Sequence, residues 1–243
     1  MSFARTDGRA ADEIRVTDIR PDFLPYAEGS ALIIMGDTRV ACSASIDESV
    51  PRWVRNKGEG WVTAEYAMLP RATHTRTPRD SSRGKTQGRT QEIQRLIGRS
   101  LRAIADLRAL GERTIYIDCD VLHADGGTRT AAITGAYVAF ALASNKLLKS
   151  GKITRPLMSD QVAAVSVGIV DNTALLDLKY DEDSRAQVDM NIVCTSAGRF
   201  IELQGTAEKG PFSREQMDEL LALGMRGIEV LIAKQKSIIS QAT

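Results

Sequence analysis

The first part of the chain alternates apolar and polar residues in the manner of short β-strands. Residues 31–35 and 39–46 are two apolar stretches separated by Gly36-Asp37, a pair that is typical of a tight hairpin turn. Residues 61–68 have the length and composition of a further strand, and residues 114–122 place an apolar side chain at every second position. This part of the chain is therefore predicted to form a sheet of mostly antiparallel strands.

Three longer segments repeat their apolar residues with the period of a helix. In residues 90–110 the apolar side chains recur every three or four positions, and the arginines fall elsewhere. Residues 128–148 are apolar almost throughout and rich in Ala and Gly, so this helix is predicted to be buried on most sides. Residues 213–236 form an amphipathic pattern that begins with Ser213 and Gln216, the pair of a capping box.

Four further apolar runs in the second part of the chain predict more strands. They cover residues 162–170, 174–180, 188–195 and 199–205. Mostly antiparallel strands combined with three long helices indicate an α+β fold. No stretch resembles an interdomain linker, so we expect residues 1–243 to form a single domain.

The composition excludes several classes of protein. Of the 243 residues, 43% are hydrophobic, which is too many for a disordered chain. No run of about 18 apolar residues predicts a membrane span, and the N-terminal residues lack the apolar core of a secretion signal. Cys42, Cys119 and Cys194 lie in apolar, strand-like runs, where they are interpreted as reduced core residues. These features together predict a cytoplasmic protein.

The net charge of +1 hides a strongly basic segment between residues 71 and 102. This basic segment has nine Lys and Arg against two acidic residues, a net charge of +7, which leaves −6 for the rest of the chain. The nine are Arg71, Arg76, Arg79, Arg83, Lys85, Arg89, Arg95, Arg99 and Arg102. A solvated helix face is the commoner meaning of such a run, but residues 70–88 are rich in Pro, Gly, Ser and Thr, which predicts a loop. An arginine-rich loop favours a nucleic-acid backbone as partner.

A glycine turn between a predicted strand and a predicted helix is the sharpest local signal. In Gly126-Gly127-Thr128-Arg129, glycines allow close approach of a ligand, and the amides of the first helical turn are donors without intrahelical partners. With a hydroxyl and a guanidinium beside them, these donors predict a phosphate pocket. An ordinary helix start capped by Thr128 is the equally simple alternative. The spacing of a Walker A loop is absent.

Carboxylates gather in the second half of the chain. If residues 174–180 and 188–195 are strands that return on each other, Asp177 and Asp189 share one face and Asp183 lies near the connection. Acidic side chains within strands are costly unless they are paired or bound to metal, and oxygen ligands alone suit Mg²⁺ or Mn²⁺. For Asp181 and Glu182 we expect only a solvated turn.

Other chemistries find no support in the sequence. No GxSxG or reactive cysteine motif accompanies His74 or His123, and no GxGxxG follows a strand. An anion pocket, a carboxylate pair and an arginine-rich segment remain. Phosphoryl transfer on a nucleic acid uses all three.

Six segments in a fixed order resemble the ribonuclease PH family. They are EYAMLPRATHTR (65–76), GRTQEIQRLI (88–97), DCDVL (118–122), ADGGTRT (124–130), Asp183-Ser184 and DMN (189–191). The similarity runs from RTDGR (5–9) to the C-terminal helix, with Val16 where the family commonly has proline. The resemblance implies two similar β-α halves with left-handed β-α-β crossovers, and a homo-hexamer built as a trimer of dimers.

The resemblance also implies an activity and residue roles. The activity is the removal of 3′-terminal nucleotides from tRNA precursors by inorganic phosphate, which releases nucleoside 5′-diphosphates. The phosphate-binding residues correspond to Arg89, Gly127, Thr128 and Arg129. The residues for catalysis and for Mg²⁺ (or Mn²⁺) correspond to Asp183 and Asp189, and those for holding tRNA to Arg71, Arg76 and Arg79. Asp177 is interpreted as a supporting group outside the ligand set.

Two alternatives stay open at this stage. One is a non-catalytic RNA-binding ring subunit of an exosome-like assembly, which need not keep the phosphate pocket and the carboxylates that this chain has. The other is a hydrolytic, metal-dependent nuclease, which needs more carboxylates and no phosphate pocket.

Overall fold

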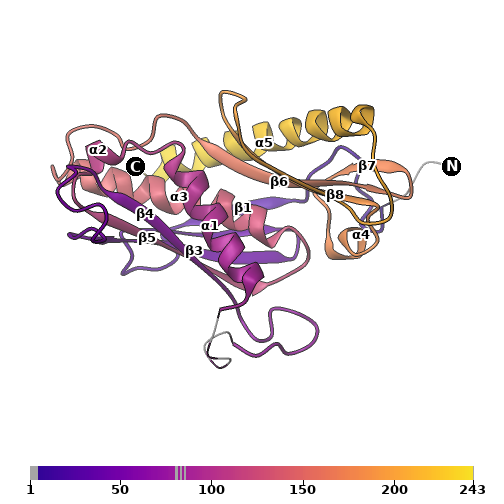
Figure 1. Ribbon diagram of the computed structural model, residues 1–243, viewed down its shortest axis with the longest axis horizontal. Helices are drawn as coiled ribbons and strands as arrows, with labels where there is room; N and C mark the ends of the chain where they lie inside the picture. Colours follow the sequence, from indigo (N-terminus) through magenta and orange to yellow (C-terminus); the bar gives the residue numbers. More distant parts are fainter. Residues whose placement is uncertain (1–4, 80–81, 83, 85, 243) are drawn as a thin grey trace.

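Two β-sheets lie side by side along the long axis of the molecule (Figure 1). The computed structural model describes residues 5–79, 82, 84 and 86–242. The first sheet has the order β1-β2-β3-β5-β4. Its strands are β1 (Thr17–Pro21), β2 (Gly29–Met35), β3 (Thr38–Asp47), β4 (Trp61–Met68) and β5 (Thr114–His123). The hairpin predicted at Gly36-Asp37 is confirmed, because Met35 pairs with Thr38 across it.

The second sheet is entirely antiparallel, with the order β7-β6-β8-β9. Its strands are β6 (Val162–Val170), β7 (Thr173–Leu176), β8 (Val188–Thr195) and β9 (Phe200–Ala207). In the first sheet β4 and β5 are parallel, and they are joined by a helix as a β-α-β unit. The mixture of antiparallel strands and long helices confirms the α+β class.

Helices of very different lengths pack between and beside the sheets. The helices are α1 (Gly88–Arg102), α2 (Leu107–Leu110), α3 (Thr128–Lys149), α4 (Tyr180–Asp183) and α5 (Arg214–Ala242). Helix α3 packs against β2 and β3 of the first sheet and against β6 of the second, so it joins the two halves. Helix α5 packs on β6 and β7 and begins with the predicted capping box, in which the Ser213 amide donates to Gln216 Oε1 at 2.8 Å.

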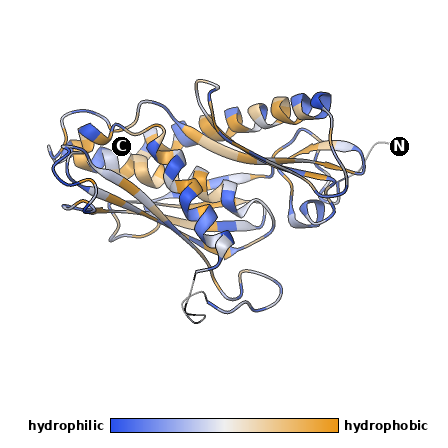
Figure 2. Ribbon diagram, viewed as in Figure 1, coloured by the Kyte–Doolittle hydropathy of each residue, from blue (hydrophilic) through white to orange (hydrophobic). Residues whose placement is uncertain are grey.

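One apolar cluster runs through both sheets and the inner helices. Figure 2 shows this pattern as apolar strands and inner helices, with hydrophilic residues along the outer side of α1. Helix α3 is long and apolar enough to cross a membrane, but 83% of its apolar window is buried inside the molecule. Its apolar character therefore belongs to the core. Cys42, Cys119 and Cys194 are buried and free, as predicted.

The bounds of two predicted elements were wrong, and one strand was not predicted. The helix predicted over residues 90–110 ends at Arg102, because Asp106 caps a separate short helix by accepting from the amides of Arg108 and Ala109. The strand predicted over residues 174–180 ends at Leu176, and α4 follows it. Strand β1 was not predicted, because it has only five residues and ends in Pro21.

Candidate functional site

Segments from both halves of the molecule line one cavity of about 350 Å³. The start of α1 contributes Arg89, and the start of α3 contributes Thr128 and Arg129 behind Gly126 and Gly127. The second half contributes Asp183 from α4 and a row of polar residues on the second sheet, which are Ser166, Asp189 and Asn191. The structure thus brings the six residues proposed for phosphate and catalysis around a single space, although they are spread over about a hundred positions of sequence.

The glycine turn has a backbone that only glycine adopts easily. Gly126 has φ +74° and Gly127, the residue before the first turn of α3, has φ +62°. A Cβ atom on Gly126 would lie 2.7 Å from the Leu178 carbonyl oxygen and 2.8 Å from the Tyr180 amide nitrogen. The turn therefore packs directly against the chain that leads into α4. Because Gly127 is the cap residue of α3, the first amides of the helix have no intrahelical acceptor, and Gly127, Thr128 and Arg129 at this end of α3 line the cavity.

Side chains from two other elements hold Arg129 of α3 in place. Its Nη1 lies 3.2 Å from Glu92 Oε1 of α1 and also donates to Gln204 Oε1 of β9. Gln204 Nε2 in turn donates to Glu92 Oε1 at 2.8 Å, which closes the triangle. Arg129 is therefore oriented before any ligand binds, which lowers the entropy cost of gripping an anion.

Thr128 is buried and bonded to the first sheet. The Tyr66 hydroxyl donates to Thr128 Oγ1 at 2.9 Å, and burial raises the pKa of Tyr66, so the phenol remains protonated. This bond fixes the hydroxyl beside the glycine turn. The alternative in which Thr128 caps the helix is wrong, because the cap position belongs to Gly127.

Asp183 lies close enough to Asp189 to influence its protonation. Loss of water around Asp189 and the negative charge of Asp183 raise the pKa of Asp189 to about 6, against the pull of Arg129 and Arg89. Loss of water also raises the pKa of Asp183, and Arg89 and Arg129 oppose that shift. Two carboxyls and two guanidinium groups thus share one electrostatic environment, which is typical of a site that handles phosphate and protons.

The second wall of the cavity comes from the loop after β4 and from α4. Met68 at the end of β4 and Thr73, His74 and Thr75 of the loop line it together with Tyr180, and the His74 and Tyr180 rings are 6.5 Å apart. The arginines proposed to hold tRNA, Arg71, Arg76 and Arg79, belong to the same loop but point to solvent and do not line the cavity. Asp80, Arg83 and Lys85 of the basic segment are outside the described residues.

Two predictions for the carboxylate region were wrong. Asp177 and Asp189 do not share a face, because β6 lies between β7 and β8 and Asp177 follows β7 in a turn with φ +54°. Asp177 is fully buried on Arg15, outside the cavity lining. Glu182 is not solvated either: it is buried against Arg5, whereas Asp181 is exposed as expected.

Several residues around the site were not predicted from the sequence. Gln204, Glu92 and Tyr66 orient Arg129 and Thr128, yet each is an ordinary polar or aromatic residue within its own element. No local spacing marks them, because their partners are between 37 and 112 positions away. The alternation of β9 does place Gln204 opposite Asn191 in the sheet, and that register becomes visible only in the fold.

Gly126→Ala is expected to lower both stability and phosphate affinity. Its Cβ meets backbone atoms rather than flexible side chains, so the turn has to move, and we expect a loss of about 2–4 kcal/mol in the free energy of unfolding. Gly151→Ala is the matched control, since Gly151 has φ +71° with open space around it, and only about 1 kcal/mol should be lost. Urea unfolding of both variants measures the difference; equal losses would contradict the close packing of the turn.

One protein family and several individual proteins match most of this chain. Residues 13–145 match the model of the 3′ exoribonuclease family, domain 1, and residues 160–227 match domain 2 of the same family. Ribonuclease PH of Bacillus velezensis is 57% identical over 238 residues, covering 98% of this chain and 97% of that protein. Ribonuclease PH of Bacillus subtilis strain 168 is 56% identical over 239 residues, covering 98% of each.

Two solved structures superpose on almost the whole of this chain. A subunit of the Archaeoglobus fulgidus exosome, solved with RNA bound to the active site, superposes with a TM-score of 0.80 at 24% identity, covering 95% of this chain and 92% of that one. Rice (Oryza sativa) Rrp46 superposes with a TM-score of 0.78 at 17% identity, covering 97% and 100%. At such identities the superpositions establish the fold.

Proposed function

Because the chain belongs to the 3′ exoribonuclease family, we propose that its cavity is where inorganic phosphate attacks the 3′ end of an RNA. The chain is a phosphate-dependent 3′→5′ exoribonuclease, as its near-full-length similarity to ribonuclease PH shows. The observation that carries the site assignment is the meeting of an anion turn, two arginines and two carboxyls in one cavity.

Phosphate occupies the end of the cavity formed by the glycine turn. The first amides of α3, the Thr128 hydroxyl and the guanidinium groups of Arg89 and Arg129 supply donors and positive charge there. Their charge offsets the repulsion between phosphate and the RNA backbone. Since Glu92 and Gln204 already engage Nη1 of Arg129, its remaining N–H groups are the ones available to phosphate.

The reaction exchanges one bond to phosphorus for another. A phosphate oxygen forms a bond to the last phosphodiester phosphorus while the bond to the 3′ oxygen of the preceding nucleotide breaks. The terminal nucleotide leaves as a nucleoside 5′-diphosphate, and the shortened RNA takes up a proton on its new 3′ oxygen. The raised pKa values of Asp183 and Asp189 let either carboxyl hold that proton. The step reverses when nucleoside diphosphate is abundant.

The carboxyl pair also fits a magnesium ion. Among the described residues no group of three or more His, Cys, Asp or Glu could hold a metal, but Mg²⁺ is commonly held by one or two carboxylates together with phosphate oxygens. Asp183 and Asp189 would hold it, and Mn²⁺ suits the same oxygens. Bound there, the ion would stabilise negative charge on the leaving 3′ oxygen.

The natural substrates we propose are tRNA precursors with extra 3′ nucleotides. The exposed arginines Arg71, Arg76 and Arg79 on the loop beside the cavity would hold the tRNA backbone. Replacing all three by Ala should weaken tRNA binding about tenfold or more at moderate salt and flatten its salt dependence, because about three fewer phosphates are neutralised. Filter binding over a series of salt concentrations measures this.

A charge-matched control separates contact from net charge. Arg20, Arg155 and Arg226 are exposed arginines on other parts of the surface, and replacing these three by Ala removes the same charge. If both triple variants lose affinity equally, the loop is not the tRNA-holding surface.

We infer a cytoplasmic homo-hexamer, built as a trimer of dimers. Several copies of the basic loop on one assembly would raise the effective concentration of arginine around a single RNA. Three buried free cysteines suit a reducing compartment. Light scattering on the purified protein gives the mass directly, and a monomer or dimer at working concentration would contradict the hexamer.

The function is tested on a tRNA with a few extra 3′ nucleotides, incubated with Mg²⁺ in the presence and absence of inorganic phosphate. We expect nucleoside diphosphates only when phosphate is present. Nucleoside monophosphates released without phosphate would mean hydrolysis. No release from an RNA that stays bound would favour the non-catalytic ring subunit.

A further inference from the structure

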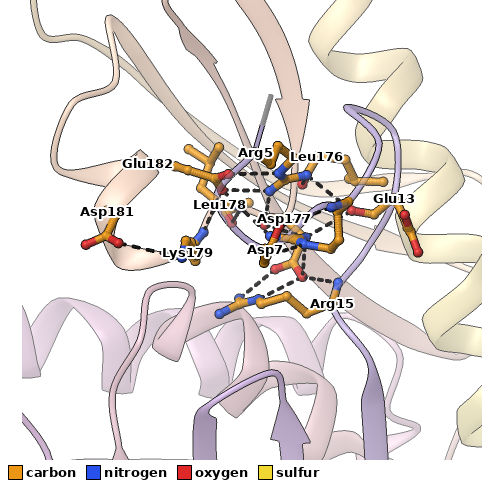
Figure 3. Close-up of polar contacts among 12 residues, drawn as sticks. Arg5, Asp7, Glu13, Arg15, Leu176, Asp177, Leu178, Lys179, Asp181 and Glu182 are labelled. Atoms are coloured by element: carbon orange, nitrogen blue, oxygen red, sulfur yellow. Dashed lines mark hydrogen bonds and ion pairs between the residues drawn. The ribbon is translucent and has the colours of Figure 1, made fainter. Parts of the chain in front are cut away.

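Buried ion pairs tie an N-terminal strap, defined here as residues 5–15, to Asp177, which follows β7, and to Glu182 of α4 (Figure 3). Arg15 Nη2 lies 2.6 Å from Asp177 Oδ1, and Arg5 Nη2 lies 2.6 Å from Glu182 Oε2. The side chains of all four residues are at most 4% exposed. Buried charge pairs of this kind are costly to assemble, so stability alone does not explain them. The strap residues do not line the cavity, so the ion pairs do not contact the ligand directly either.

Arg15 connects Asp177 to the glycine turn. Its Nε and Nη2 both donate to the Asp177 carboxylate, at 2.9 and 2.6 Å, and its Nη1 donates to the Asp125 carbonyl at 2.5 Å. A Cβ on Gly127 would lie 2.9 Å from Arg15 Nη2, so the guanidinium also packs under the turn. Arg15 thus touches the backbone that presents the phosphate donors but does not line the cavity.

Asp177 is held in a conformation that its own backbone disfavours. With φ +54° it is a non-glycine residue in the left-handed region, and such residues persist only where several contacts fix them. The Asp177 amide donates to the Ser166 carbonyl at 2.7 Å, and the Arg5 guanidinium donates to the Asp177 carbonyl at 2.9 Å. Burial disfavours the charged form, but Arg15 overcomes this and holds the pKa of Asp177 below its ordinary value.

The second ion pair fixes the short helix that carries Asp183. Glu182 accepts from Arg5 Nε at 2.8 Å and from the Lys179 amide at 3.1 Å, so its carboxylate ties the start of α4 to the strap. Asp183 is the next residue. The strap therefore touches both the turn that offers phosphate donors and the helix that offers a carboxylate.

From these contacts we propose that Arg15, with Asp177, positions the phosphate turn and that Arg5, with Glu182, positions Asp183. These are positioning residues, and the inference rests on the proposed phosphate site. The first pair acts on phosphate affinity, since the turn supplies donors to phosphate. The second pair acts on the rate of the chemical step, since Asp183 faces the reacting bond.

Arg15→Lys tests the first pair. A lysine keeps the positive charge on Asp177 but lacks the fork that reaches the Asp125 carbonyl at the same time. We expect KM for inorganic phosphate to rise about tenfold or more while kcat at saturating phosphate stays within about threefold. Glu182→Gln should show the opposite split, with kcat about tenfold lower and KM for phosphate within about twofold.

Thr38 offers an independent test of the same turn that leaves no buried charge unpaired. Its buried hydroxyl donates to the Gly126 carbonyl at 2.7 Å and accepts from the Asp125 amide at 3.0 Å. Thr38→Val removes both bonds, together with the 3.5 Å contact from Arg15 Nη1, at nearly constant shape and should raise KM for phosphate in the same direction as Arg15→Lys. Thr38→Ser keeps the hydroxyl and should retain the wild-type KM.

A variant with lower stability but an intact strap gives the reference. Leu110→Ala opens a cavity in α2, which Figure 1 shows at the opposite end of the molecule from α4. It should lower Tm without changing KM for phosphate. If Arg15→Lys and Thr38→Val behave like Leu110→Ala, with lower Tm and unchanged KM, the ion pairs are merely structural and the proposal is wrong. If the wild type shows no dependence on phosphate at all, the proposed function has failed and this inference fails with it.

Discussion

Asp189→Asn is expected to lose about 100-fold or more of the phosphorolytic rate while making the metal-free protein more stable. The activity falls because Asn neither carries a proton nor offers a charged ligand. The stability rises because ionised Asp189 is disfavoured in the fold, with its pKa raised to about 6 from an ordinary 3.8 by loss of water and by Asp183. The Asp189 carboxyl therefore increases the phosphorolytic rate but lowers the free energy of unfolding.

The stability gain of Asp189→Asn should depend on pH in a defined direction. A carboxyl with a raised pKa in the folded state costs stability as the pH rises from about 4 to about 6, and the cost then stays constant. We expect the variant to be about 1–3 kcal/mol more stable at pH 7 and equal to the wild type near pH 3.5. Urea unfolding with a chelator present, at both pH values, measures this. A gain that is the same at both would contradict the assignment to Asp189.

Asp181→Asn is the matched control for the activity. Asp181 is an exposed carboxylate in the same short helix as Asp183 but outside the cavity lining. The phosphorolytic rate of Asp181→Asn should stay within about twofold of the wild-type rate. This substitution removes an equal charge from the same neighbourhood without touching the reacting groups. Equal losses of rate in Asp181→Asn and Asp189→Asn would mean that the net charge around the site, and not Asp189 itself, controls the rate.

Arg129→Ala should reduce kcat/KM for phosphate about 100-fold or more, because the anion loses an oriented guanidinium whose side chain is only 12% exposed. The loss also leaves the Glu92 carboxylate and the Gln204 amide without their shared partner, so the cavity becomes more negative where phosphate must enter. Arg129→Lys should recover part of the affinity through charge alone, since it lacks the fork. Steady-state rates over a phosphate titration give the numbers.

Arg155→Ala provides the comparison for Arg129. Arg155 is an exposed arginine paired with Asp106, away from the cavity, so its removal should leave KM for phosphate unchanged. Wild-type kcat/KM in Arg129→Ala would place phosphate elsewhere and overturn the site described above.

Features that depend on neighbouring residues were predictable from the sequence. The strand-to-helix turn at residues 125–129 was recognised because Gly126 and Gly127 stand where the apolar alternation stops and a helical period begins. The capping pair Ser213 and Gln216 was recognised for the same reason, since both of its hydrogen bonds span three residues.

Features that depend on distant partners were not predictable. Asp177 binds Arg15 across 162 positions, and Glu182 binds Arg5 across 177, so a rule of local polarity assigned Glu182 to solvent. This long separation in sequence also explains why the strand predicted over residues 174–180 ends too late. Strand β7 ends at Leu176 because Asp177 adopts a left-handed backbone conformation to meet Arg15. Arg89 was assigned to the same phosphate site as the glycine turn because of the family resemblance, and not because of the periodicity of the sequence.

The path of the phosphate atom tests the central claim most directly. Unlabelled tRNA with extra 3′ nucleotides is incubated with ³²P-labelled inorganic phosphate, and the released nucleotides are separated. The account predicts that all of the label appears in the β-phosphate of nucleoside 5′-diphosphates, and that Arg129→Ala forms far less of this product at the same phosphate concentration. Unlabelled nucleoside monophosphates as the main product would contradict it.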